Sequence, residues 1–161
     1  MSASSLASRL IKSSGKSKVT ILSVSNMGDK RVINQTDVPI LNVMLGGDLD
    51  GGITSGVTQV IGDSRTFKTN ICVEVSASFL EADENAVVVF FDCEFGGMKA
   101  FKKRLKPADL NRVIHMPFED LEDLKFQMTK MLEDVKEGEK VLFFIDSISQ
   151  VASKKEVDNA I

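Results

Sequence analysis

Two unbroken apolar runs constrain the fold of this chain more than any other feature. They are Ala86-Val-Val-Val-Phe-Phe91 and Val141-Leu-Phe-Phe-Ile145, and each is followed at once by an aspartate, Asp92 or Asp146. A strand with one wet face alternates apolar and polar residues, whereas a parallel strand covered on both faces is apolar throughout. The two runs therefore predict buried parallel strands, and hence an α/β domain.

The segments around these runs alternate in the same way. Helical spacing or strand-like composition predicts helices over 68–80 and 98–105 and after Pro117, with strands over 57–61 and 112–115. The helix after Pro117 places Leu121, Leu124, Met128, Met131, Leu132 and Val135 on one face, and Gly138 ends it. Alternating strands and helices predict a parallel sheet flanked by helices over residues 38–161.

Composition narrows the class of protein. The chain has 161 residues, the size of one compact domain, and its 20 basic and 23 acidic residues give a net charge of −3. That balance argues against a globally basic nucleic-acid coat. No apolar run reaches the length of a membrane span, and two cysteines make no disulfide framework. We therefore expect a cytoplasmic protein without a membrane partner.

Residues 1–37 differ from the rest. A short amphipathic helix is predicted near the N-terminus, and a polar, poorly periodic stretch separates it from the core pattern. A lone short helix is marginal in water, so its apolar face needs a partner. The sequence leaves open whether that partner is the helix's own domain or another subunit. The apolar residues at helical spacing are Ala3, Leu6, Ala7, Leu10 and Ile11.

A phosphate-binding motif lies between the predicted strand 57–61 and the helix that follows. The motif is G-x-x-x-x-G-K-[ST], and the segment matches it at every position but one. Such a loop presents backbone N–H groups at a helix N-terminus, while its lysine reaches the β- and γ-phosphates and its hydroxyl ligates Mg²⁺. We therefore predict an ATP site with Mg²⁺. The segment comprises Gly62, Asp63, Ser64, Arg65, Thr66, Phe67, Lys68 and Thr69.

The departure is Phe67, where the motif has glycine. We expect a negative φ at this helix entry, which lets a side chain point away from the phosphates. On that expectation the site keeps its function, although nucleotide approach or release is altered.

Carboxylates after the two buried strands complete the candidate site. Asp146 has the position that holds Mg²⁺ through its water shell beside a phosphate loop. Asp92 and Glu94 both have a position from which a carboxylate polarises the attacking water. Position alone leaves the choice between them open, and leaves the alternative that both are solvated loop acids.

With these residues in place, the chain resembles the RecA/UvsX family of strand-exchange recombinases, above all its phage members. The likeness rests on 38–46, Gly51-Gly-Ile-Thr-Ser-Gly56, the Phe-Lys-Thr loop, Asp92-Cys-Glu-Phe-Gly96, Arg112-Val-Ile-His-Met-Pro117, 138–147 and 152–156. It implies a RecA-like P-loop core, with Glu94 as the group that activates water. It also implies that Phe101 stacks on adenine, although a core position for Phe101 is equally compatible with the sequence.

The resemblance further implies a filament-forming, DNA-dependent ATPase that works on single-stranded DNA, in the host cytoplasm if phage-encoded. The N-terminal helix would be the subunit contact. In the family the DNA-binding loops lie beyond the strand ended by Asp146, so we expect an incomplete core without them. Two alternatives are an inactive assembly or capping module and another RecA-superfamily ATPase, such as a helicase core.

We interpret two remaining features, a group of basic residues and the histidine, as structural. Six basic residues surround the helix 98–105, and we read them as a solvated helix face in preference to a phosphate contact. They are Lys99, Lys102, Lys103, Arg104, Lys106 and Arg112. His115 lies in an apolar strand without cysteine or histidine at metal-ligand spacing, so we read it as structural.

Overall fold

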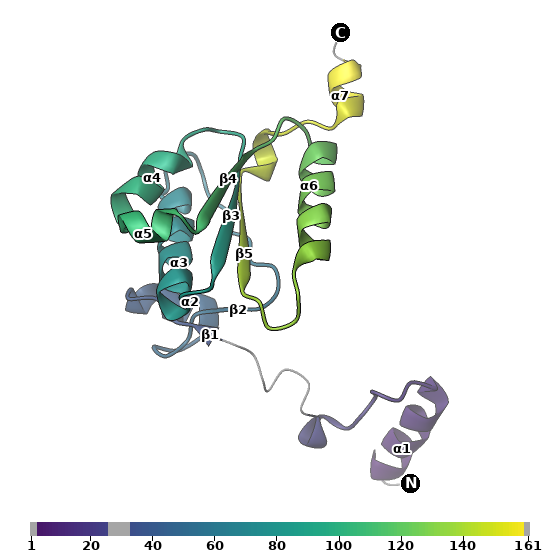
Figure 1. Ribbon diagram of the computed structural model, residues 1–161. Coiled ribbons are helices and arrows are strands. Elements are labelled where there is room, and N and C mark those ends of the chain that lie inside the picture. Colours follow the sequence, from purple (N-terminus) through teal and green to yellow (C-terminus); the bar gives the residue numbers. More distant parts are fainter. Residues whose placement is uncertain (1–2, 26–32, 160–161) are drawn as a thin grey trace. The chain divides into compact units, whose positions relative to one another are not determined.

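A computed structural model describes residues 3–25 and 33–159 (Figure 1). The chain divides into two units, residues 1–32 and 33–161, so the boundary falls before the expected position at 37/38. The second unit begins earlier because strand β1 pairs with β2 and because Asn42 binds Thr36. In the first unit, helix α1 spans Ala3–Ser14 and a 3-10 helix, η1, spans Leu22–Val24.

The second unit contains the elements that form the core. Its elements in chain order are β1 Ile33–Asn34, α2 Pro39–Gly46, β2 Ile53–Thr54, α3 Lys68–Ala82, β3 Val87–Asp92, α4 Gly97–Arg104, α5 Pro107–Leu110, β4 Val113–Pro117, α6 Leu121–Asp134, β5 Val141–Asp146, the 3-10 helix η2 Ile148–Gln150 and α7 Lys154–Asp158. Strands β4, β3 and β5 form a parallel sheet in that order, while β1 and β2 form a separate antiparallel pair.

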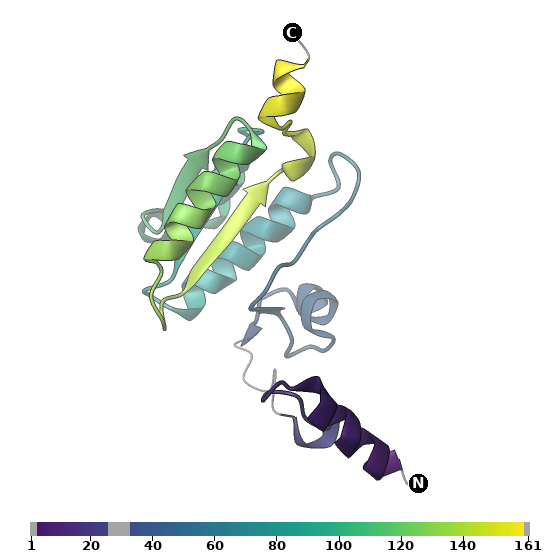
Figure 2. The ribbon, with the colours of Figure 1, turned by 90° about the vertical axis from the view of Figure 1, so that its right-hand side faces the viewer.

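The parallel sheet is covered on both faces, as the unbroken apolar runs predict. Helices α3 and α4 lie on one face and α6 lies on the other (Figures 1 and 2). Val88 and Phe90 of β3 pack in the cluster that includes Phe101 of α4. Val89 and Phe91, the intervening residues, pack in the cluster that includes Leu124 of α6. Side chains of a strand alternate between the faces, so one apolar run supplies both cores.

One expected strand is absent from the described part of the chain. Residues 57–61 belong to no helix or strand, and the side chains of Val57 and Ile61 are largely exposed. The prediction of a strand here was therefore wrong for this structure. A strand needs a neighbour for its backbone groups, and among the described residues β5 pairs only with β3. Apolar composition favours a strand but supplies no neighbour.

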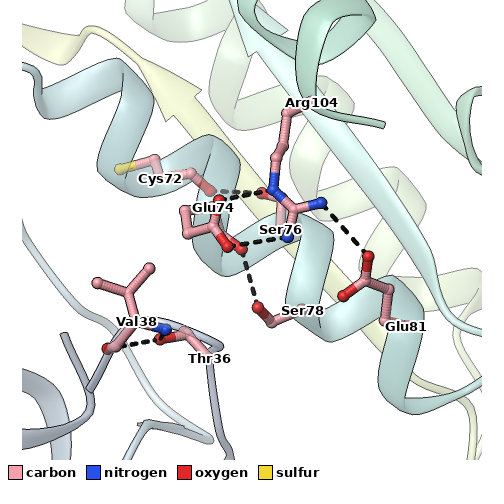
Figure 3. A network of polar contacts seen from close by, with 8 residues as sticks. All are labelled: Thr36, Val38, Cys72, Glu74, Ser76, Ser78, Glu81 and Arg104. Carbon is pink, nitrogen blue, oxygen red and sulfur yellow. Dashed lines mark hydrogen bonds and ion pairs between the residues drawn. The ribbon is translucent and has the colours of Figure 1, made fainter. Parts of the chain in front are cut away.

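Side chains fix how the helices meet the sheet and each other. Gly97 begins α4 directly against the Phe90 ring, where an added Cβ would collide with the ring. Arg104 of α4 binds Glu74 of α3 through two nitrogens, at 2.6 and 2.9 Å, and reaches Glu81 at 3.3 Å (Figure 3). This bidentate contact joins α3 to α4 at the surface of the domain.

Arg112, the residue directly before β4, fixes the turn between α3 and β3. Its guanidinium donates to the carbonyl oxygens of Leu80 at 2.9 Å, Asp83 at 2.8 Å and Ala86 at 3.2 Å. It also pairs with Asp109 at 2.7 Å. The side chain of Arg112 thus satisfies a carbonyl of the last turn of α3, that of Leu80, and two carbonyls of the turn that follows.

Helices long and apolar enough to cross a bilayer do not occur in the described part of the chain.

Candidate functional site

The site begins with the candidate phosphate loop, residues 62–67, which leads into α3. Lys68, the first residue of α3, donates from Nζ to the carbonyl oxygens of Gly62 and Asp63, both at 2.8 Å. The Thr66 hydroxyl donates to the Asp63 carbonyl at 2.7 Å. The loop thus wraps around its own lysine. An anion entering here would replace those carbonyls as the partner of Lys68.

The conformation of the loop corrects one prediction. Phe67 has φ 64°, in the left-handed region, and not the negative φ expected at the helix entry. Arg65 has φ 65°. Non-glycine residues pay about 1–2 kcal/mol in this region because Cβ approaches the next carbonyl. The loop therefore keeps the backbone shape that the motif's glycine suits, with Phe67, a residue 71% exposed, in the glycine's place.

A pocket of about 540 Å³ opens at the N-terminus of α3. It brings the predicted phosphate, metal and water-activating residues together although they come from distant parts of the sequence. The candidate phosphate loop supplies one side and the segments after β3 and β5 supply the other. The lining residues are Gly62, Ser64, Arg65, Thr66, Phe67, Lys68, Thr69, Asn70, Glu94, Asp146, Ser147 and Ser149.

Thr69 and Asp146 meet where the sequence predicts a Mg²⁺ site. The Thr69 hydroxyl donates to Asp146 Oδ2 at 2.7 Å. Burial raises the pKa of Asp146, the Thr69 hydrogen bond opposes that rise, and the nearby charges of Glu94 and Asp92 add to it. A hydroxyl and a carboxylate fit Mg²⁺, a hard cation that takes few protein ligands and retains waters.

The described residues contain no cluster of three or more histidine, cysteine or acidic side chains that could hold a metal ion by themselves. A Mg²⁺ ion at Thr69 and Asp146 would thus complete its shell with water and phosphate oxygens.

Glu94 enters the pocket from the loop after β3. Its Oε1 accepts a hydrogen bond from the Ser147 hydroxyl at 2.7 Å, and Ser147 Oγ lies 3.1 Å from Ser149 Oγ. Sequence reasoning missed both serines. The available signal was their place directly after Asp146, at the carboxyl edge of a parallel sheet, where ligands bind in such folds.

Asp92, the other candidate for activating water, does not line the pocket. Its side chain is 0% exposed, and both of its oxygens are engaged by loop amides and by His115. The geometry thus separates the two acids that position alone could not. Glu94 is the one that faces the space a substrate can enter.

Phe101 lies away from the pocket. It is 2% exposed and packs against Phe90, with ring centroids 5.1 Å apart, and against Phe144 at 6.0 Å. In this structure its ring faces are covered by the core of the α3 face, so it has no free face for adenine. The alternative that the sequence left open, a core position, describes Phe101.

The basic residues around α4 also separate into two groups. Arg104 and Arg112 are held by the contacts described above. Lys99, Lys102 and Lys103 are exposed on α4, and Lys106 follows them.

The structure thus defines an α/β domain with a motif-like loop, two carboxylates and a threonine around one pocket. A scan against protein-family models finds no match. Over 158 residues the chain is 37% identical to the "Recombination and repair protein" of Enterobacteria phage T4. The alignment covers 98% of this chain and 40% of that protein, so the chain spans about two fifths of the length of the curated relative it matches.

Proposed function

We propose that this chain binds ATP with Mg²⁺ in the pocket at the N-terminus of α3 and hydrolyses it. The observation that carries the proposal is that Lys68, Glu94 and Asp146 line one pocket, with Thr69 bonded to Asp146. These are the groups that phosphoryl transfer needs to hold phosphate, metal and water.

Each residue has a definite part in the proposal. Lys68 exchanges its two carbonyl partners for phosphate oxygens, and the loop amides turn toward the same anion. Thr69 and Asp146 would hold Mg²⁺, and the ion would neutralise charge on the phosphates. Glu94 leaves Ser147 to accept a proton from the attacking water.

We further propose a role in DNA recombination and repair, of the RecA/UvsX type. The support is the 37% identity to a phage protein of that printed name, together with the resemblance in motifs. In this proposal ATP sits between neighbouring subunits of a filament on single-stranded DNA, with DNA-dependent hydrolysis in the host cytoplasm. The α1 helix supplies the contact between subunits.

The ATP proposal is tested by Lys68→Ala, with Lys99→Ala as the matched control on an exposed helix position. The substitution removes charge-assisted hydrogen bonds from Lys68 to phosphate, which contribute about 1.5–3 kcal/mol. We expect the Kd for MgATP to rise about 10–100-fold in Lys68→Ala and to stay unchanged in the control. Calorimetric titration measures both. Equal affinity in wild type and Lys68→Ala would contradict the ATP site.

A second function is favoured by the first unit. Leu6 and Leu10 of α1 are largely exposed. A helix with solvent-exposed leucines is suited to packing on a partner. In this second proposal the chain acts as an assembly or capping module without hydrolysing ATP. ATP hydrolysis by the purified chain, lost in Glu94→Gln, favours the enzyme. Its absence with preserved nucleotide binding favours the module.

A further inference from the structure

We infer that Asp92 and His115 form a clamp that fixes the loop 93–96, and with it the Glu94 carboxylate, at the edge of the pocket. Asp92 and His115 are positioning residues in this inference, because neither lines the pocket. The clamp concerns only the conformation of the loop. Its effect on catalysis rests on the proposed function of Glu94.

Asp92 is placed to hold the loop from inside the sheet. It is the last residue of β3 and its side chain is 0% exposed. Its Oδ1 accepts the backbone N–H of Glu94 at 3.1 Å and that of Phe95 at 2.7 Å. Both bonds are local and run from strand end to loop, so they set the direction in which the chain leaves β3.

His115 holds the other oxygen of the same carboxylate. Its Nε2 lies 3.1 Å from Asp92 Oδ2. His115 belongs to β4, where it is the register partner of Phe90 on β3, and its ring lies 5.5 Å from the Phe90 ring. The neighbouring strand thus fixes the rotation of the Asp92 side chain. Once that rotation is fixed, Oδ1 faces the loop amides.

The loop needs such support because its shape is strained. Phe95 has φ 56°, a region that residues with a side chain rarely adopt. Phe95 is 62% exposed, so little packing holds it in place. The hydrogen bond from the Phe95 N–H to Asp92 Oδ1 is the contact that favours this conformation, and the Glu94 side chain is then directed at Ser147. A site gains precision when a supporting group locks the residue that acts.

The test compares two substitutions at one position in the full chain. His115→Leu removes the ring nitrogen while keeping an apolar body, and His115→Gln returns an N–H near the place of Nε2. Ile114→Leu, on the same strand, is the matched control. Amide hydrogen exchange of Glu94 and Phe95 reports on the clamp directly. We expect exchange about tenfold faster in His115→Leu and within twofold of wild type in the other two, because these amides exchange when their hydrogen bonds to Asp92 open.

Steady-state ATPase kinetics supply the second readout. We expect kcat to fall about tenfold in His115→Leu with the KM for ATP within twofold, because loss of positioning affects the chemical step more than binding. In His115→Gln we expect kcat to recover. A general loss of structure would change KM and the thermal unfolding midpoint as well.

Three results would overturn the clamp. One is unchanged exchange at Glu94 and Phe95 in a folded His115→Leu. Another is equal loss in the Gln and Leu variants, which would show that the donor is irrelevant. The third is faster exchange throughout the sheet, which would make His115 a general core residue. If wild type does not turn over ATP, the proposed function fails, yet the exchange measurement still decides whether the clamp exists.

Discussion

The two loops that border the pocket both contain a phenylalanine with positive φ, yet they are supported in different ways. In the loop 93–96, buried Asp92 accepts two backbone amides and is itself held by a neighbouring strand. In the candidate phosphate loop, Lys68 and Thr66 bind the loop's own carbonyls, and residues 62–67 are exposed. The first loop is held by the sheet, whereas the second is held by its own hydrogen bonds, which under the proposed function would be exchanged for bonds to a ligand.

The largest expected effect is a difference in the free energy of unfolding between variants of two aspartates, Asp92 beside the loop 93–96 and Asp63 in the candidate phosphate loop. Asp92→Ala leaves the amides of Glu94 and Phe95 without their acceptor, so we expect the free energy of unfolding to fall by about 2–4 kcal/mol. Asp63→Ala changes an exposed side chain whose backbone carbonyl does the bonding, so we expect a change below about 0.5 kcal/mol. Urea denaturation measures both, and equal effects would show that the loops are not supported differently.

A middle effect concerns the contact between the helices that follow the two loops. Arg104 and Glu74 are joined at 2.6 Å, and both side chains are partly exposed, which reduces their contribution. We expect Arg104→Ala to lower the free energy of unfolding by about 1–2 kcal/mol at pH 7. The matched control is Lys102→Ala, an exposed position on the same helix.

The same variant has a pH dependence of definite sign. The Arg104 hydrogen bond lowers the pKa of Glu74 below its ordinary value, although burial opposes this. A lowered folded-state pKa gives stability that is present above the ordinary pKa and is lost as the pH falls through the folded value. The difference between wild type and Arg104→Ala should therefore shrink between about pH 5 and pH 3. A difference that grows on acidification would contradict the ion pair.

The smallest effect is expected at the two phenylalanines. Phe67→Gly removes the cost of a left-handed side chain, about 1–2 kcal/mol, that the loop already carries before any ligand binds. A cost present in both the free and the bound loop cancels from the affinity, so we expect the Kd for MgATP to stay within about twofold of wild type, measured by calorimetry. Phe95→Gly should leave the affinity unchanged, because its loop is already held. Weaker binding in Phe67→Gly would show that the ring itself contacts the ligand.

The sequence predicted those parts of the fold that depend on local pattern. The runs ending at Asp92 and Asp146 became β3 and β5, because an apolar strand reports burial on both faces. The helix after Pro117 became α6, with Asp120 accepting the N–H of Asp123 at its N-terminus. Residues 57–61 did not become a strand, because pairing depends on a neighbour and not on composition.

The candidate site was predicted in part for the same reason. The motif placed Lys68 and Thr69 at a helix N-terminus, and strand ends placed Asp146 and Glu94 near them. The contact between His115 and Asp92 joins residues on separate strands, so the spacing of residues along the sequence does not predict it. For Phe101 the sequence allowed two positions, because its place after Glu94 suits a contact with a ligand and a position in the core equally well.

The position of Arg112 has a consequence for engineering of this chain. The turn between α3 and β3 is at the surface, where insertions and labels are usually tolerated. Here one planar guanidinium spans the carbonyls of Leu80, Asp83 and Ala86, so the length of the turn is fixed by the reach of a single side chain. An added residue would push at least one carbonyl out of that reach. The turn is therefore a poor site for an epitope tag, and lysine cannot replace Arg112 there without loss.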